Sequence, residues 1–272
     1  MLIDVKKYSP SLRRLWAEVF GDDEEYAGLL FNEDNLPCEC FAEIADGQVV
    51  SVLYLLESEI RLKGKVFYGR YLYAAATADS YRKKGLMAGL IRQAQEYVRE
   101  KGLSFISLVP ADEGLYGYYS RFGFEAVMSN YRAAADDLPW REKGEEMSPE
   151  AYFAFRDKLD LSGFSFSGSA LRYALSCLVY SDYEFLSNSD DSCYILSADG
   201  GDVLEYISSE ENFAVNTHTF LSRLGKDTDI VSPYDLSDFC QCSKNKFGMA
   251  YITDDEMKNI LNDKIYMNIA LD

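Results

Sequence analysis

The chain has 272 residues, of which 48% are hydrophobic and 14% aromatic, enough for one large domain or two of modest size. Its 27 basic and 45 acidic residues give a net charge of −18, and such a field repels nucleic acids and anionic membranes. There is no apolar run of 18 residues and no signal peptide at the start, so we expect a cytoplasmic protein without a membrane span.

The six cysteines do not follow the spacing of a common metal site. Four of them form two Cys-x-Cys pairs, Cys38 with Cys40 and Cys240 with Cys242, whose spacing is shorter than that of the usual zinc knuckle. The single histidine, His218, adds little support to a zinc site. We therefore expect reduced thiols and no bound metal.

The first part of the chain predicts two helices followed by a β-hairpin. Residues 12–21 place apolar side chains on one face of a helix, and the acidic stretch 22–34 predicts a second helix. Residues 38–57 read as two strands that meet at Asp46-Gly47, a strong hairpin signal.

Residues 71–102 predict a strand, a basic turn and a helix. The strand runs from Tyr71 into the small residues 74–78, which leave room beside the main chain for a linear ligand. The helix begins near Leu86 with apolar residues at helical spacing, and Gly102 stands where a C-terminal cap is expected.

The turn between this strand and helix, residues 82–87 (RKKGLM), suits an anion. The first turn of a helix leaves N–H groups unpaired, and the helix dipole makes that end positive. Gly85 allows a ligand to approach the backbone closely, and three basic residues precede it. The turn therefore predicts a phosphate or pyrophosphate site; an ordinary turn with solvated lysines is the alternative.

A second segment follows at a short distance. Residues 103–109 form an apolar run suited to a buried strand, and the next short helix carries Tyr116, Tyr118 and Tyr119. Gly123 reads as the cap of that helix. A phenol stays protonated at neutral pH, so one of these tyrosines could act as a general acid.

The basic turn, Arg82-x-x-Gly85-x-Met87, resembles the Q/R-x-x-G-x-G/A motif of the GCN5-related N-acetyltransferase (GNAT) family. In that family the loop amides hold the pyrophosphate of acetyl-CoA, and the pantetheine arm pairs with the preceding strand. Met87 departs from the small residue that the family has at the last position, which affects how closely the helix packs on the cofactor. The resemblance implies a cofactor-binding set of Ala75, Ala76, Thr77, Arg82, Lys83, Lys84, Gly85, Leu86 and Met87.

The helix end, Tyr119-x-x-x-Gly123-Phe124, resembles the family's FYxxxGF segment, whose tyrosine protonates the departing CoA thiolate. The resemblance therefore implies that Tyr119 is the general acid. The family often has Asn seven residues earlier, where this chain has Asp112, and an acidic side chain there can cap the helix instead. The resemblance covers roughly residues 1 to 135.

The resemblance also implies where the acceptor amine binds. In the family the N-terminal helix pair borders the acceptor site, so Glu24, Glu25 and Tyr26 are candidate substrate contacts; alternatively, the acids only complement the helix dipole. In Eis-type members the C-terminal carboxylate reaches the active site of the N-terminal domain. The apolar end YMNIALD therefore makes Asp272 the candidate general base, with a strand end exposed to solvent as the alternative.

The charged stretch 136–150 is the best linker candidate. We predict a GNAT domain that binds acetyl-CoA and carries catalysis at residues 1–138, and a degenerate GNAT-like domain at 139–272 that completes the acceptor cleft. The second part repeats the element order of the first, but the acidic segment 208–213 (SSEENF) replaces the phosphate loop. This arrangement is similar to Eis-type acetyltransferases without their third domain.

The expected fold class is α/β with a mixed sheet, the GNAT fold in two copies. The expected function is direct transfer of an acetyl group from acetyl-CoA to a primary amine, on a small molecule or a protein side chain. The acidic charge favours a cationic acceptor such as a polyamine or an aminoglycoside, although solubility explains the charge equally well. A non-catalytic CoA-binding or interaction module and an aminoacyl-tRNA-dependent transferase stay open as alternatives. The acceptor's identity, the use of a longer acyl donor and the presence of a homo-oligomer are also left open.

Overall fold

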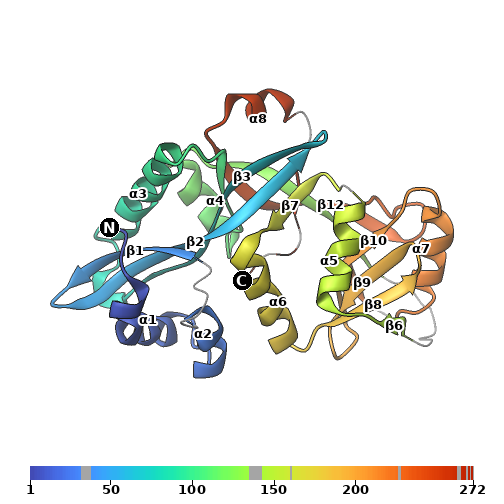
Figure 1. The fold of residues 1–272 in the computed structure, drawn as a ribbon, viewed down its shortest axis with the longest axis horizontal. Coiled ribbons are helices and arrows are strands. Elements are labelled where there is room, and N and C mark those ends of the chain that lie inside the picture. Colours follow the sequence, from blue (N-terminus) through green and yellow to red (C-terminus); the bar gives the residue numbers. More distant parts are fainter. Residues whose placement is uncertain are drawn as a thin grey trace.

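The computed structural model of the protein describes residues 1–31, 38–134, 143–159, 161–225, 228–261, 265–267, 269 and 271. These residues form one mixed sheet of 13 strands with helices packed on its faces (Figure 1). The fold class is therefore α/β with a mixed sheet, as the sequence predicts. Within these ranges, no helix is both long and apolar enough to cross a membrane.

The elements of the first part follow the predicted order. The first helix begins earlier than expected, because the Asp4 side chain caps it by accepting from the Lys6 N–H and the helix continues through Pro10. The bounds are α1 (Val5–Val19), α2 (Glu24–Leu30), β1 (Cys38–Ala45), β2 (Gln48–Leu62), β3 (Lys65–Thr77), α3 (Leu86–Glu100), β4 (Phe105–Leu108), α4 (Glu113–Ser120) and β5 (Glu125–Ala134).

The hairpin between β1 and β2 turns where the sequence predicts. Asp46 and Gly47 have φ of 51° and 75°, the left-handed values that a type I′ turn needs at both central positions. Lys63 and Gly64 repeat this pattern, with φ of 51° and 72°, between β2 and β3. The predicted turn at Asp46-Gly47 is confirmed, and the two turns set the register of three antiparallel strands.

The second part repeats the topology of the first. Strands β8, β9 and β10 pair antiparallel in order, and α7 then leads to β11, which is parallel to β10. The same sequence of pairings joins β1, β2, β3, α3 and β4, so the predicted repeat is confirmed. The bounds are β6 (Glu145–Glu146), α5 (Pro149–Lys158), β7 (Gly163–Phe166), α6 (Gly168–Tyr180), β8 (Glu184–Ser189), β9 (Ser192–Leu196), β10 (Asp202–Ser208), α7 (Phe213–Leu221), β11 (Asp229–Ser232), β12 (Gln241–Ile252), α8 (Asp255–Ile260) and β13 (Ile265–Tyr266).

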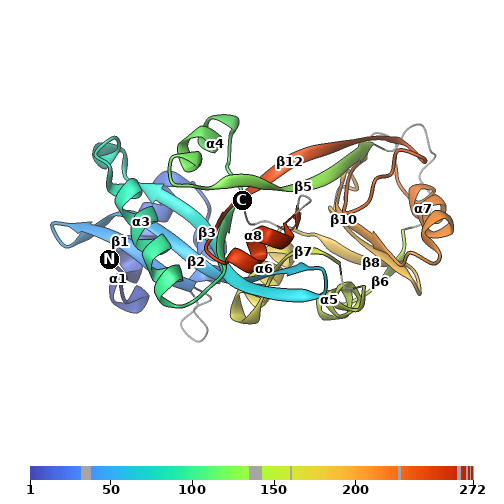
Figure 2. The same ribbon diagram turned by 90° about the horizontal axis from the view of Figure 1, so that it is seen from above.

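The last long strands of the two parts are exchanged. β12, from the second part, pairs with β4 of the first part, and β5 of the first part pairs with β11 of the second. β5 and β12 also pair with each other and run side by side through the middle of the molecule (Figure 2). The two parts thus share strands in one sheet. The predicted boundary between residues 138 and 139 lies outside the described residues and stays a prediction.

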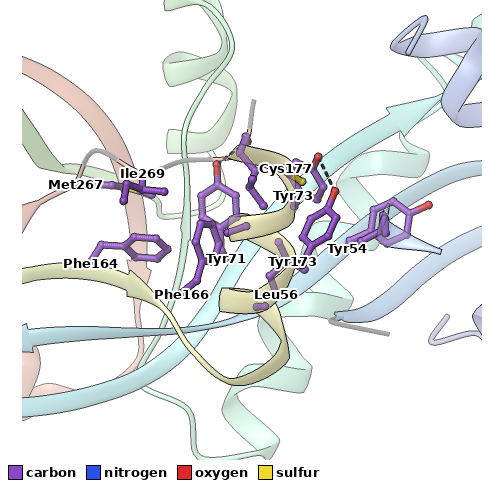
Figure 3. Packing of buried hydrophobic residues seen from close by; sticks show 14 of the residues in the cluster. Tyr54, Leu56, Tyr71, Tyr73, Phe164, Phe166, Tyr173, Cys177, Met267 and Ile269 are labelled. Carbon is purple, nitrogen blue, oxygen red and sulfur yellow. Dashed lines mark hydrogen bonds between the residues drawn. The ribbon is translucent and has the colours of Figure 1, made fainter. Parts of the chain in front are cut away.

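The sheet of the first part is covered on both faces. On the first face, α1, α2 and α6 pack over aromatic side chains of β2, β3 and β7, including Tyr71 and Tyr73 (Figure 3). On the second face, α3 and α4 pack over Leu72 of β3 and Ile106 of β4. Side chains alternate along a strand, so the neighbours Tyr71 and Leu72 serve different cores.

Candidate active site

The two central parallel strands separate at their carboxyl ends. β3 pairs with β4 from Gly69, opposite Phe105, to Tyr71, opposite Ser107. β3 nevertheless continues to Thr77, and its pairing with β2 continues with it. Beyond Tyr71, the side of β3 that faced β4 is therefore free of a partner strand among the described residues.

A β-bulge lies where the strands separate. The register between β2 and β3 shifts between Tyr73 and Ala76, so Ala74 and Ala75 stand opposite one residue of β2. Ala74 has φ of 45°, in the left-handed region that residues other than glycine rarely occupy. Bulges redirect a strand and occur often beside active sites. The bulge and its small side chains give a ligand access to the main chain of β3.

A cavity of about 620 Å³ lies at this separation. Its lining comes from α1 and the α1–α2 connection, the ends of β3 and β4, the helix α4, the strand β12, and Leu271. Trp16 and Tyr73 belong to the core of the first face, whereas Tyr119 belongs to the core of the second face. The cavity therefore joins the two faces of the sheet through the opening between β3 and β4.

The turn at residues 82–87 has the backbone that an anion site needs. Gly85 is the N-cap of α3 with φ of 81°, and Lys83 has φ of 62°. No described side chain caps α3, and its first turn contains no acidic residue, so the first N–H groups point to open space without a side-chain acceptor. A Cβ built at Gly85 would meet nothing within 4 Å. This helix start fits a phosphate or pyrophosphate group.

The basic side chains of the turn differ in how they are held. The Arg82 Nε donates to the Thr77 carbonyl at 3.1 Å, and the Arg82 guanidinium pairs with Asp79 at 2.9 Å, so Arg82 ties the turn to the end of β3. The Lys84 ammonium lies 4.6 Å from the centre of the Tyr81 ring. Lys83 makes no hydrogen bond or ion pair with any described residue, which leaves its charge available to a ligand.

The predicted cofactor-binding residues lie partly at the cavity and partly at the start of α3. Ala75 lines the cavity, whereas residues 82–87 lie outside its lining, at the start of α3. Ala76 is buried, and the Thr77 hydroxyl is 2.8 Å from the Ser51 hydroxyl, so these two residues can offer a ligand only backbone groups. Met87 is partly buried against the core of the second face, which accommodates its larger side chain.

Tyr119 is brought to the cavity by α4. Only 8% of the residue is exposed, and its ring packs edge-on against Phe124 at 5.8 Å and Tyr118 at 5.3 Å. Burial raises the pKa of Tyr119 to about 12, so its phenol keeps its proton at neutral pH. None of the described residues hydrogen-bonds to its hydroxyl, which leaves the proton free for a ligand.

Tyr116, one turn earlier, lines the same cavity but is already engaged. Its hydroxyl donates to the Phe247 carbonyl at 2.7 Å, and the Lys246 ammonium lies 3.6 Å from the centre of its ring. The sequence alone could not choose between the tyrosines of this helix. The hydrogen bonds favour Tyr119 as the proton donor. Asp112 caps α4 by accepting from the Leu115 N–H at 3.1 Å, which is the structural role that the sequence allowed.

The three predicted acceptor contacts do not line the cavity. Glu24 accepts a hydrogen bond of 2.6 Å from Arg13, Glu25 is exposed, and Tyr26 packs its ring 5.5 Å from that of Tyr180. Glu24 and Glu25 begin α2, and their charges complement its dipole. Tyr26 shares a side-chain hydrogen bond with Tyr73, which lines the cavity. The role of the three residues as substrate contacts stays a prediction.

Residues of α1 and of the α1–α2 connection line the cavity instead. Trp16, Phe20 and Asp22 line the cavity, and the Trp16 Nε1–H donates to the Asp22 carboxylate at 2.8 Å. The periodicity of α1 identified Trp16 and Phe20 only as core residues, and Asp22 only as a helix-start charge. Lys246 and Phe247 were missed altogether, because they reach the site through the exchanged strand β12, which no local sequence pattern reveals.

Asp272, the predicted general base, lies outside the described residues, so its role stays a prediction. The residue before it does reach the site. Leu271 lines the cavity, and its carbonyl accepts a hydrogen bond of 3.2 Å from the Tyr71 hydroxyl. In the described part of the chain, no cluster of three or more His, Cys, Asp or Glu residues could hold a metal ion.

Comparison with known proteins places this fold. Residues 6–127 match the family described as "Acetyltransferase (GNAT) domain". A GCN5-related N-acetyltransferase from Kribbella flavida has a TM-score of 0.70 at 18% identity, covering 93% of this chain and 71% of the other. Eis1 from Mycobacterium abscessus has a TM-score of 0.69 at 13% identity, covering 96% and 75%. No curated protein matches the sequence.

The similarity in fold extends over both parts of the chain. A Pyrococcus horikoshii structure covers 98% of this chain and 93% of the other, with a TM-score of 0.58 at 15% identity. The matched family domain holds the turn at 82–87, the opening between β3 and β4, and Tyr119. Residues 6–127 are therefore a GNAT acetyltransferase domain, and the chain as a whole has the fold of GNAT structures, with a second GNAT-like half.

Proposed function

We propose that this protein is an acetyl-CoA-dependent N-acetyltransferase that transfers an acetyl group directly to a primary amine. One observation carries the proposal: Tyr119, whose hydroxyl has no hydrogen-bond partner among the described residues, lines the cavity that joins both faces of the sheet at the opening between β3 and β4. A donor can enter from the face of α3 and an acceptor from the face of α1. The two would meet beside a proton donor.

The donor route starts at the turn of residues 82–87. Its N–H groups and Lys83 would hold the pyrophosphate of acetyl-CoA, and the open side of β3 would receive the pantetheine arm as an additional strand does. This route ends at the bulge of Ala74 and Ala75, where a backbone N–H can polarise the thioester carbonyl. The small side chains there allow that close approach.

The chemistry needs no covalent intermediate on the protein. The neutral amine attacks the thioester carbonyl, the C–N bond forms, and the C–S bond breaks as Tyr119 gives its proton to the departing thiolate sulfur. No cysteine is among the described residues that line the cavity, which supports direct transfer. The proton lost by the amine would go to the carboxylate of Asp272, directly or through a water molecule.

Free-thiol release with acetyl-CoA and a panel of primary amines tests the proposal, with mass spectrometry of the products. The expected result is one N-acetylated amine formed for each thiol released, abolished when the amine is omitted. The rival function, a non-catalytic CoA-binding module, predicts calorimetric binding of acetyl-CoA without product from any amine, and that result would refute ours.

A further inference from the structure

Resting on the proposed transferase function, we propose that the acceptor is an arylalkylamine, bound with its ammonium group at Asp22 and its ring against an aromatic wall. The aromatic wall is formed by Phe20, Trp16, Tyr73 and Tyr71. All four residues line the cavity: Trp16 from α1, Phe20 from the C-cap of α1, and the two tyrosines from β3.

The aromatic wall is continuous. The ring of Phe20 lies 4.9 Å from that of Trp16, Trp16 lies 5.9 Å from Tyr73, and Tyr73 lies 6.4 Å from Tyr71, centre to centre. Phe20, at the outer end, is 41% exposed, whereas Trp16 and the tyrosines are buried. Phe20 is therefore the ring that a ligand reaches at the mouth of the cavity, and the three buried rings behind it support that surface. A flat apolar group can gain area burial and ring–ring contact at Phe20.

The polar atoms of the aromatic wall already have hydrogen-bond partners within the protein. The Tyr73 hydroxyl accepts from the Tyr173 hydroxyl at 3.2 Å (Figure 3). The Trp16 Nε1–H donates to Asp22, and the Tyr71 hydroxyl donates to the Leu271 carbonyl. A polyhydroxylated amine such as an aminoglycoside would lose water from its hydroxyls here without finding partners, which is costly. An aryl ring has no such groups to satisfy. The wall thus favours an apolar body over a sugar.

On this side of the cavity, Asp22 is the charged side chain that can still form an ion pair with a ligand. One carboxylate oxygen accepts from Trp16, and Asp22 forms no ion pair with any described residue. The other charged groups of the lining are occupied: Asp112 caps α4, and Glu113 pairs with Lys246 at 3.2 Å. A single available carboxylate beside aromatic rings suits one ammonium group, through charge and cation–π attraction. A polyamine would bring two or more charges to this one acid.

The orientation follows from the same arrangement. Trp16 holds Asp22 at the junction of α1 and α2, and the wall continues from there to Tyr71, next to the opening between β3 and β4. An arriving ammonium group is first held at Asp22. It then leaves Asp22, gives its proton to the carboxylate of Asp272, directly or through a water molecule, and reaches the thioester as the neutral amine. Asp22 is a binding residue for the charged form of the amine, so its loss should affect KM more than kcat.

The test compares 2-phenylethylamine and tryptamine with spermidine and kanamycin, by thiol release with acetyl-CoA. We expect kcat/KM to be at least about tenfold higher for the two arylalkylamines, the size of one well-made charged contact. A preference for spermidine or kanamycin would overturn the acceptor class while leaving the transferase function intact. If no amine is acetylated, the transferase function is wrong, and calorimetric binding of 2-phenylethylamine to the CoA-loaded protein still decides the binding claim.

Two variants locate the binding groups. Asp22→Asn keeps an acceptor for Trp16 and should raise the KM for 2-phenylethylamine about tenfold with kcat nearly unchanged. Glu96→Gln, an exposed acid on α3 outside the cavity, is the matched control. Phe20→Ala, at the exposed mouth, should raise the KM for 2-phenylethylamine and leave that for ethylamine unchanged. Equal effects of Asp22→Asn and Glu96→Gln, or an equal effect of Phe20→Ala on both amines, would overturn the assignment.

Discussion

The hydroxyl of Tyr116 donates a hydrogen bond of 2.7 Å to the carbonyl of Phe247, a residue 131 positions later on the exchanged strand β12. This bond commits the proton of Tyr116, which lines the cavity from α4 together with Tyr119 and is the alternative acid on that helix. It also means that the second part of the chain, through β12, helps to define the chemistry of the first.

Tyr119→Phe should therefore lower kcat by about 100-fold, because the variant keeps the packing of the ring and removes only the proton donor. Its dissociation constant for acetyl-CoA should stay near that of the wild type. Tyr116→Phe is the matched control and should cost much less. Steady-state kinetics and calorimetry check both. A large loss in Tyr116→Phe with a nearly normal Tyr119→Phe would show that the acid is the other tyrosine.

The pH dependence follows from the burial of Tyr119. A tyrosine donates a proton only below its pKa, and burial raises that pKa to about 12, above the usual value of about 10. We expect kcat to rise with pH as the amine loses its proton and then to stay level up to a pH of about 10.5. The kcat profile over this range is the measurement. A falling limb centred near pH 9 to 10, lost in Tyr119→Phe, would contradict the raised pKa.

The anion site at the start of α3 can be tested with two glycines of the same conformation. Gly85 and Gly64 have φ of +81° and +72°, and a Cβ at either meets nothing within 4 Å. Gly85→Asp should raise the dissociation constant for acetyl-CoA at least about tenfold, because a carboxylate competes with the pyrophosphate for the free N–H groups. Gly64→Asp carries a similar backbone strain on a distant turn and should leave the affinity unchanged. Calorimetry showing equal affinities for both variants would remove the pyrophosphate from this turn.

The role of Asp272 leads to a prediction about the end of this sequence. If its carboxylate accepts the proton of the amine, a short Gly-Ser extension should lower kcat about tenfold or more without weakening acetyl-CoA binding. Tyr71→Phe, which removes the hydrogen bond to Leu271, should lower kcat in the same direction and shift the pH profile. Unchanged turnover in the extended protein would exclude the carboxylate from the mechanism.

Local sequence patterns predicted the elements whose structure depends on residues close together in the chain. The Asp46-Gly47 turn, the strand and helix around residues 82–87, and the repeat in the second part all follow from turn residues and periodicity. The start of α1 was placed too late, at residue 12, because the apolar periodicity begins there; the Asp4 cap starts the helix at Val5, and it continues through Pro10. The short strand β7 was missed, since four residues after a glycine carry little periodic information.

The pairing of distant segments could not be predicted in the same way. β12 lies between β4 and β5 through hydrogen bonds that any strand could make, so the sequence of β12 does not name its neighbours. This is why Lys246 and Phe247 were absent from the predicted site. Trp16 has two roles at once, as a core residue that is 3% exposed and as part of the cavity wall, and the periodicity of α1 reveals only the first.

The most direct test of the account is a rapid-mixing experiment on direct transfer. The protein is mixed with excess acetyl-CoA, first without and then with an amine that supports turnover, and free thiol and N-acetylated amine are followed together. Direct transfer at Tyr119 predicts no thiol burst without the amine, and equal rates of thiol and product formation with it. A burst of thiol equal to the amount of protein, before any amine is added, would show an acyl-enzyme and contradict the mechanism.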